Sequence, residues 1–200
     1  MNENEIYLKN EKKANLALAF TSLVLAVFLL ITLILNVCKV EAFLYSEAIN
    51  KTIVILLPIM IVALCIPACL LKTKFVGKSW FKYYLLISFV VSIGITGFLV
   101  PQEGIFFAAC VIASTLYFKP KVTRITFYVT LALMIIAPVI AVAFNEYEPV
   151  YTSFIGNKWG ALFLFNVTPR VLAIIIIAQI TNGLAKRADL VLKEEVTEVK

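Results

Sequence analysis

The hydrophobic positions of this chain gather into long runs that are separated by short polar segments. A helix of about 20 apolar residues spans the hydrocarbon core of a bilayer, and the runs here reach or approach that length. They predict an all-α membrane protein with six transmembrane helices, the fourth of which would rise only about 21 Å at 1.5 Å per residue. The six helices are expected at residues 14–37, 52–71, 83–100, 105–118, 125–144 and 159–181.

Two of the predicted helices contain residues that alter hydrogen bonding or packing. Pro58 and Pro67 lie in the helix at 52–71. Each lacks a backbone N–H group, a loss that membrane helices tolerate where a neighbour satisfies the freed carbonyl. Gly94 and Gly97 lie in the next helix and are small enough to let another helix approach closely, a common packing device in lipid.

The charged residues indicate how the helices are oriented. The loop between the second and third helices and the loop between the fourth and fifth carry basic charge alone, whereas acidic residues outnumber basic ones in the other loops. An excess of Lys and Arg marks the cytoplasmic side. Both termini are therefore predicted to be cytoplasmic, in the inner (plasma) membrane of the cell. The basic loop residues are Lys72, Lys74, Lys78, Lys82, Lys119, Lys121 and Arg124.

Composition supports this organisation and indicates which partners the chain binds. Hydrophobic residues make up 62% of the 200 positions, above the roughly half that is usual in soluble domains, so the lipid bilayer is the main expected partner. The net charge of +6 is accounted for by orientation, which leaves no basic face for nucleic acid. We expect a polar cytoplasmic segment at 1–13, a six-helix transmembrane domain at 14–184 and a cytoplasmic helical tail at 185–200.

The tail differs in character from the helices before it. Residues 185–200 are good helix formers and are predicted to continue the sixth helix into the cytoplasm. A seam with spacings of three and four runs along them, typical of the start of a coiled coil, and would allow a homodimer through this helix. The seam consists of Ala185, Ala188, Leu192, Glu195 and Val199.

Several kinds of chemistry lack the residues they need. The sequence contains no histidine, which excludes histidine-based triads and histidine metal sites. It also has no glycine-rich phosphate loop and no paired carboxylates on one helix. The four cysteines lie in or at the ends of apolar runs, without a third ligand nearby for a metal. We expect no enzymatic activity, no metal and no cofactor.

One charged side chain interrupts the sixth apolar run. An arginine inside a membrane is costly unless it is paired or faces water, and Arg170 permits two interpretations. In the first, it forms a structural ion pair with Glu103, which lies at a similar depth of about 24 Å from the cytoplasmic charges. In the second, it binds a small anionic ligand in a pocket that opens outward. The residues expected to line that site are Arg170, Asn166, Thr168, Glu103, Tyr147, Tyr151 and Trp159.

Three features together resemble a known class of proteins. One is the tight turn between the third and fourth helices, followed by Leu116-Tyr117-Phe118-Lys119-Pro120-Lys121; the others are Thr168-Pro169-Arg170 and the helical run at 181–200. The chain resembles the N-terminal six-helix membrane regions of bacterial multi-pass signalling proteins. In those, such a region precedes a diguanylate cyclase, chemoreceptor or serine-phosphatase domain. An output domain of this kind is absent from these 200 residues.

Two functions follow as hypotheses. The first is a membrane sensor or anchor module, in which a ligand or a membrane state shifts the sixth helix and the shift passes into the tail. The alternative is a small six-helix subunit that resembles the substrate-binding components of vitamin transporters. Its size and topology fit the sequence, whereas the charged helical tail favours the sensor.

Overall fold

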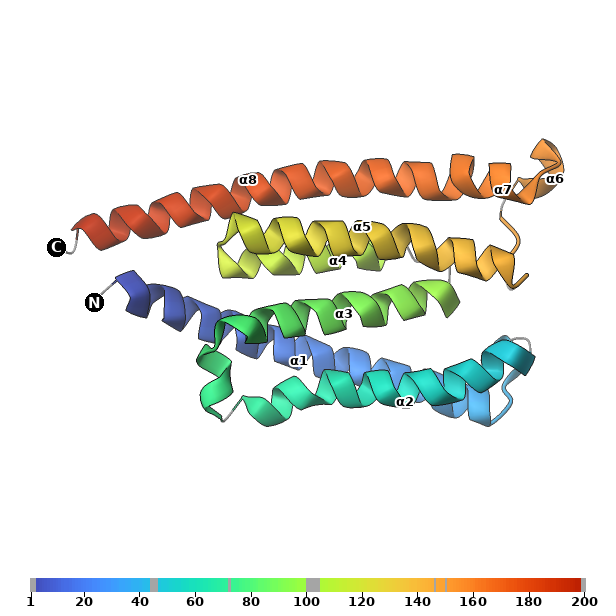
Figure 1. The fold of residues 1–200 in the computed structure, drawn as a ribbon, viewed down its shortest axis with the longest axis horizontal. Helices are drawn as coiled ribbons and strands as arrows, with labels where there is room; N and C mark the ends of the chain where they lie inside the picture. The colour runs from blue at the N-terminus through green and yellow to red at the C-terminus, as the bar shows by residue number, and fades with distance from the viewer. Residues whose placement is uncertain are drawn as a thin grey trace. The chain divides into compact units, whose positions relative to one another are not determined.

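The computed structural model describes residues 3–43, 47–71, 73–99, 105–145, 147–149 and 151–198 (Figure 1). The regular elements in these ranges are all helices, and none is a strand. This confirms the predicted all-α class. The chain divides into two compact units: Lys12–Phe89 forms one, and Met1–Glu11 joins Val90–Lys200 in the other.

The first unit contains most of one long helix, the whole of a second and the beginning of a third. They are α1 (Glu3–Val37), α2 (Glu47–Leu70) and α3 (Ser79–Leu99), with the short 3-10 helices η1 (Glu41–Phe43) and η2 (Lys74–Gly77) in the connections. Two buried asparagines fasten these connections. Asn15 donates from Nδ2 to the carbonyl of Val76 at 2.9 Å, and Asn36 donates to the carbonyl of Phe43 at 2.7 Å. Each bond satisfies a backbone group that the turn leaves without a helical partner.

A neighbouring helix supplies the donor that is missing in α2. Pro67 has no N–H group, so the carbonyl of Ala63, four residues earlier, loses its helical partner. The hydroxyl of Tyr84 on α3 donates to that carbonyl at 2.8 Å. The freed carbonyl is thus satisfied from outside the helix, as expected for a proline within an apolar membrane helix.

The second unit contains three helices that pack against one another, α4, α5 and α8 (Figure 1). Shorter helices form the connections between them. In chain order the elements are α4 (Ile105–Ser114), η3 (Thr115–Tyr117), α5 (Pro120–Ala143), α6 (Thr152–Ile155), α7 (Lys158–Ala161), the π-helix η4 (Leu162–Val167) and α8 (Thr168–Glu198).

Two glycines on α3 allow close approach within this unit. A Cβ atom placed on Gly97 would lie 3.0 Å from the ring of Phe107 on α4. One placed on Gly94 would lie 3.2 Å from the side chain of Leu133 on α5. Both distances are shorter than ordinary carbon contacts, so the small size of these residues is required for packing, as predicted.

Five of the described helices are long and apolar enough to cross a membrane, by length and composition. A further apolar helix, Phe106–Tyr117, is shorter and coincides with the fourth predicted helix, which the sequence also expects to be short. Such helices are compatible with a membrane location. The five long ones are Glu5–Val37, Ile49–Leu70, Ser79–Gly97, Pro120–Ala143 and Lys158–Glu194.

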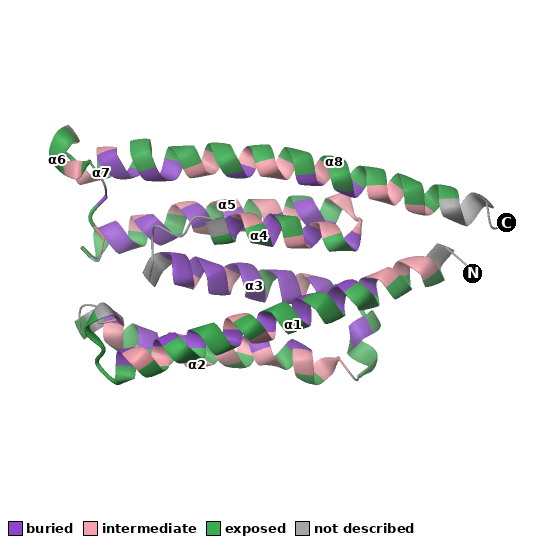
Figure 2. Cartoon of the chain, turned by 180° about the vertical axis from the view of Figure 1, so that it is seen from behind, coloured by how far each residue is buried: buried purple, intermediate pink, exposed green. Residues whose placement is uncertain are grey.

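The surfaces of these helices carry many exposed apolar side chains. Figure 2 shows exposed residues along α1, α2 and α8, and Phe20, Ile55 and Tyr128 are among the most exposed large side chains. Soluble proteins rarely present apolar surface on this scale. In a bilayer the same faces would contact lipid, whose chains are as apolar as the side chains themselves.

Some helix bounds differ from the predicted ones. α1 begins at Glu3, so residues 3–13 of the polar segment predicted at 1–13 are part of the first helix. The helix predicted at 159–181 is divided among α7, η4 and α8. α8 then runs without a break through Gly183 to Glu198, in agreement with the predicted continuity. No change of backbone structure marks the boundary proposed after residue 184.

Candidate functional site

The backbone is irregular shortly before Arg170. Residues Leu162–Val167 form a π-helix, and the N–H group of Thr168 donates to the carbonyl of Phe163, five residues earlier. Pro169 contributes to this irregularity, since it has no N–H group to offer the carbonyl of Phe165. π-Helical turns within longer helices are frequent at functional sites. The π-helix contains Asn166 and directly precedes the turn that contains Arg170, two of the predicted site residues.

Asn166 on this turn is buried, with 7% of its surface exposed. Its Nδ2 donates to the hydroxyl oxygen of Tyr147 at 2.9 Å. Its Oδ1 is also buried and has no hydrogen-bond partner among the residues that the structure describes. An unsatisfied buried acceptor costs about 1–3 kcal/mol, so the turn presents an acceptor that a ligand's donor, or water, would satisfy.

Tyr147 links Asn166 to the arginine. It packs against an apolar cluster of Val142, Leu162 and Val167, which fixes its ring. Arg170 is half-buried and lies four residues after Asn166, one helical turn away. Arg170 and Tyr147 are near enough to interact electrostatically. The structure therefore brings together three of the predicted site residues, and they offer a cation, an amide and a hydroxyl.

The other predicted residues lie elsewhere. Thr168 is exposed and, two residues from Asn166, falls on a different side of the helix. Tyr151 is exposed and its ring packs against Phe165 at a centroid distance of 4.9 Å. Trp159 is also exposed, with the Lys158 ammonium 6.0 Å from its ring. Glu103 lies outside the described residues, so the proposed ion pair with Arg170 stays a prediction.

A second polar cluster lies at the charged end of the same unit. Its Asp189–Lys193 pair, four residues apart on one helix, follows from the sequence, whereas its contact with Tyr7 does not. The hydroxyl of Tyr7 donates to Oδ1 of Asp189 on α8 at 2.6 Å, and Lys193 pairs with Oδ2 of Asp189 at 2.9 Å. Asp189 lies beyond the apolar part of α8. The hydrogen bond from Tyr7 lowers the pKa of its carboxyl below the ordinary value, and Lys193 lowers it further.

The turn before α5 completes this cluster. Glu11 is buried and forms an ion pair with Lys119, whose ammonium lies 5.3 Å from the centroid of the Tyr7 ring. Asn10 donates from Nδ2 to the carbonyl of Leu116 at 3.1 Å. We call the residues Tyr7, Asn10, Glu11, Lys119 and Asp189 the terminal latch.

A sequence signal for the terminal latch exists. Tyr7, Asn10 and Glu11 have spacings of three and four, which places them on one face of a helix. The polar character of residues 1–13 predicts a cytoplasmic segment and does not by itself reveal this face. Within an extended α1 it becomes a docking face.

The first cluster offers groups that can bind an anion. Arg170, Asn166 and Tyr147 can bind an anionic group through charge and hydrogen bonds, but none of them is a nucleophile with an adjacent base. No group of three or more His, Cys, Asp or Glu side chains that could hold a metal occurs in the part of the chain that the structure describes. Comparison with protein-family models, with curated proteins and with solved structures finds no match to this chain.

Proposed function

We propose that this chain is a membrane sensor or anchor module in which α8 links a ligand-binding group to a charged cytoplasmic helix. The ligand-binding group is Arg170, Asn166 and Tyr147, and its ligand is a small anion. In this proposal the chain crosses a bacterial inner membrane six times, and both termini lie in the cytoplasm. The basic loops support that orientation.

The observation that carries the proposal is the continuity of α8. One unbroken helix, Thr168–Glu198, contains Arg170 near its beginning and Asp189 in its charged part. A continuous helix transmits a displacement along its axis because its backbone hydrogen bonds resist local bending. A displacement at the ligand-binding group would therefore also move the charged part of α8.

The π-helix provides a local element with two arrangements. Its hydrogen bonds span five residues, whereas those of an α-helix span four. If η4 became α-helical, the part of α8 that follows would rotate by about 100° and move by about 1.5 Å relative to the preceding turn. An anion that also carries an O–H donor can satisfy the buried Oδ1 of Asn166, which accepts hydrogen bonds only. Such a ligand would favour one arrangement over the other by its differential affinity.

Such a movement of α8 would change the contacts of the terminal latch. Rotation of α8 changes the direction in which Asp189 points, and Tyr7 can donate to its carboxylate only over a narrow range of positions. Movement at Arg170 would thus loosen or tighten the charged part of α8. This gives the sensor an output that can be measured without knowing its downstream partner.

Hydrogen exchange of α8 in lipid nanodiscs tests the proposal. Arg170→Gln removes the charge but keeps a long polar side chain, so it perturbs the ligand-binding group itself. We expect the exchange rates of residues 185–194 to change in this variant, together with those of residues 162–170. Lys158→Gln is the matched control, since it removes a basic charge from α7, where Lys158 bonds to Asn145; residues 185–194 should exchange as in the wild type.

Two results would contradict the proposal. Exchange at 185–194 that is the same in Arg170→Gln and the wild type would show that α8 does not transmit the perturbation. An equal change in Lys158→Gln would show that any lost charge at that end has the same effect. A transport subunit would bind an anion at Arg170 and leave exchange at 185–194 unaltered.

A further inference from the structure

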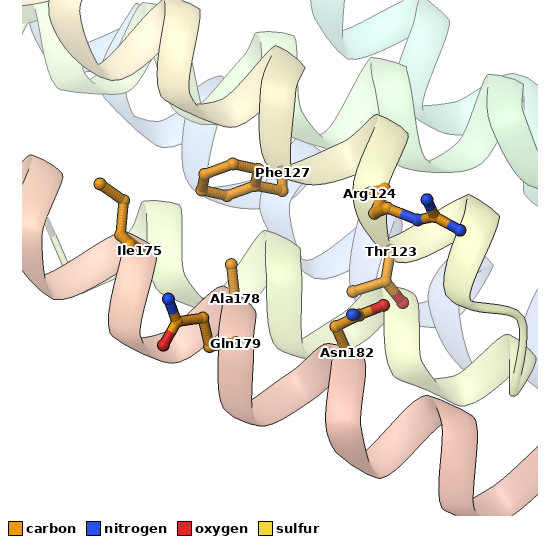
Figure 3. A pocket seen from close by; sticks show the side chains of 7 residues that line it. All are labelled: Thr123, Arg124, Phe127, Ile175, Ala178, Gln179 and Asn182. Carbon is orange, nitrogen blue, oxygen red and sulfur yellow. The ribbon is translucent and has the colours of Figure 1, made fainter.

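A cavity of about 210 Å³ lies between α5 and α8 (Figure 3), and none of the predicted site residues lines it. Phe127 of α5 and Ile175 and Ala178 of α8 form its apolar walls. Thr123 and Arg124 of α5 lie near Asn182 of α8 at one end, and Ile175 lies toward the other (Figure 3). We call the end beside Thr123, Arg124 and Asn182 the polar end, although nearly all of the surface that the cavity exposes is apolar.

The polar end contains two buried atoms that lack a partner. Thr123 is only 1% exposed, and its Oγ1 has no hydrogen-bond partner in the described part of the chain. Oδ1 of Asn182 is in the same situation. Figure 3 shows these two side chains pointing toward one another from facing helices. Buried polar groups are normally satisfied. Both atoms are closed to solvent as they stand, and each would gain a partner if its side chain turned into the cavity.

The charge at this end is positive. Arg124 is exposed and makes no ion pair in the described ranges, whereas the nearby acids of the terminal latch already have basic or hydroxyl partners. Lys186 follows Asn182 by one helical turn and lies on the same side of α8. Arg124 is about 7.5 Å along the helix from Lys119, close to the boundary between charged and apolar residues, where lipid headgroups lie.

We propose that this cavity binds a phospholipid with an anionic headgroup. The phosphate contacts Arg124, the headgroup hydroxyls reach Thr123 and Asn182, and the first part of one acyl chain lies against Phe127, Ala178 and Ile175. The cavity is smaller than the roughly 300–1,000 Å³ of sites that enclose a drug-sized ligand. A lipid fits this limit because the rest of the molecule remains in the bilayer.

The apolar walls favour a lipid over a soluble anion. A free phosphate would use only the polar end and would leave the surfaces of Phe127 and Ile175 facing an empty or wet space. The exposed amide of Gln179 also borders the cavity, in a segment where lipid chains alone would leave it unsatisfied. A headgroup near Gln179 provides the polar partner that a hydrocarbon chain cannot.

Lipid titration of the delipidated protein in detergent tests the proposal. Phosphatidylglycerol and phosphatidylcholine with identical acyl chains are compared by the rise in melting temperature, and glycerol phosphate serves as the headgroup without chains. We expect phosphatidylglycerol to bind most tightly and glycerol phosphate to have no effect at the same concentration. Arg124→Gln should weaken phosphatidylglycerol binding about tenfold or more, since it removes a charged hydrogen bond.

Matched variants separate this site from general surface charge and from unfolding. Lys121→Gln removes a nearby exposed charge outside the cavity and should keep the lipid preference. Ala178→Leu fills the cavity and should abolish binding of both lipids, whereas Ala173→Leu, on an exposed part of the same helix, should not. Thr123→Val keeps the shape but removes the unpartnered hydroxyl. It should preserve the melting temperature without lipid and weaken phosphatidylglycerol binding.

Three outcomes would overturn the proposal. Equal binding of the two lipids by the wild type would deny any headgroup recognition. An equal loss of phosphatidylglycerol binding in Arg124→Gln and Lys121→Gln would show that the lipid responds to surface charge in general and not to this cavity. Tight binding of glycerol phosphate would make the site one for a soluble phosphate compound instead of a lipid.

Discussion

The hydroxyl of Tyr7 donates a hydrogen bond of 2.6 Å to Oδ1 of Asp189, and so joins two residues that lie 182 positions apart. Tyr7 belongs to the first turns of α1, and Asp189 to the charged part of α8. The bond fastens α8 beyond its apolar part. It is therefore the contact whose loss would release the charged part of that helix without disturbing the apolar packing.

Tyr7→Phe should loosen the charged part of α8. The substitution removes one hydrogen bond to a charged group, worth about 1.5 kcal/mol at the lower end of the usual range, because the Asp189 side chain is partly exposed. We expect faster hydrogen exchange at residues 185–194 and little change in the apolar helices. Tyr128→Phe, at an exposed tyrosine of α5, is the control and should leave these rates as in the wild type.

The terminal latch should weaken in acid. The pKa of Asp189 is lowered in the folded protein by Tyr7 and Lys193, so the ionised carboxylate is the form that stabilises the fold. Its contribution is present above the ordinary carboxyl pKa of about 3.9 and is lost as the pH falls through the lowered folded value. Melting temperature measured from pH 6 to pH 3, values chosen to bracket about 3.9, should fall less steeply in Asp189→Asn. Parallel curves for the two proteins would contradict this assignment.

Arg170→Ala distinguishes the two interpretations of Arg170. For the ligand-binding group proposed here, the variant should melt near the wild-type temperature but lose stabilisation by inorganic phosphate, whose P–OH group can donate to Asn166. A structural pair with Glu103 predicts otherwise. Arg170→Ala and Glu103→Gln would each destabilise the protein, and the double variant would be less damaged than the sum of the two.

Tyr84→Phe should destabilise α2, because Tyr84 bonds to the carbonyl that Pro67 leaves without a helical donor. Without the hydroxyl, the carbonyl of Ala63 has neither a helical donor nor Tyr84, and a buried unsatisfied carbonyl costs about 1–3 kcal/mol. Pro67→Ala restores an N–H group to that carbonyl. Tyr84→Phe should therefore cost less stability in a Pro67→Ala background than in the wild type, as measured by chemical denaturation in micelles. An equal cost in both backgrounds would rule out the shared carbonyl as the cause.

Cysteine labelling tests the proposed orientation. In a background without the four natural cysteines, Ser153→Cys should react with an impermeant thiol reagent in intact cells, and Ser79→Cys should react only after the cells are opened. Both positions are exposed, so a failure to react reports the side of the membrane and not burial. Labelling of position 79 but not 153 in intact cells would invert the topology.

The helices were predictable because each depends on local information. Apolar runs of membrane length and good helix formers after residue 181 specify α8 without reference to other segments. The requirement for small residues at Gly94 and Gly97 was also predictable, since close helix packing in lipid favours them. Their partners, Leu133 and Phe107, could not be named, because pairing depends on the rotation of each helix about its axis.

The candidate site was predictable only in part for the same reason. Asn166 and Arg170 share a side of one helix through their spacing, and that relation follows from the sequence. Tyr147 comes from a loop, and its position under the π-turn depends on tertiary packing against Val142 and Leu162. The turn itself escaped prediction because a π-helix has no distinct hydrophobic period, although Pro169 marks where regular bonding must fail.

The terminal latch also imposes an order on the biosynthesis of this protein. Asn10, Glu11 and Tyr7 find their partners 106, 108 and 182 positions later in the chain, so the first turns of α1 emerge from the ribosome long before those partners exist. At about 5–20 residues per second, the wait for Asp189 lasts roughly 10–40 s. During that interval the side chains of Glu11 and Tyr7 have not yet met the partners that they contact in the folded chain. The second unit therefore closes last, when the final helix arrives.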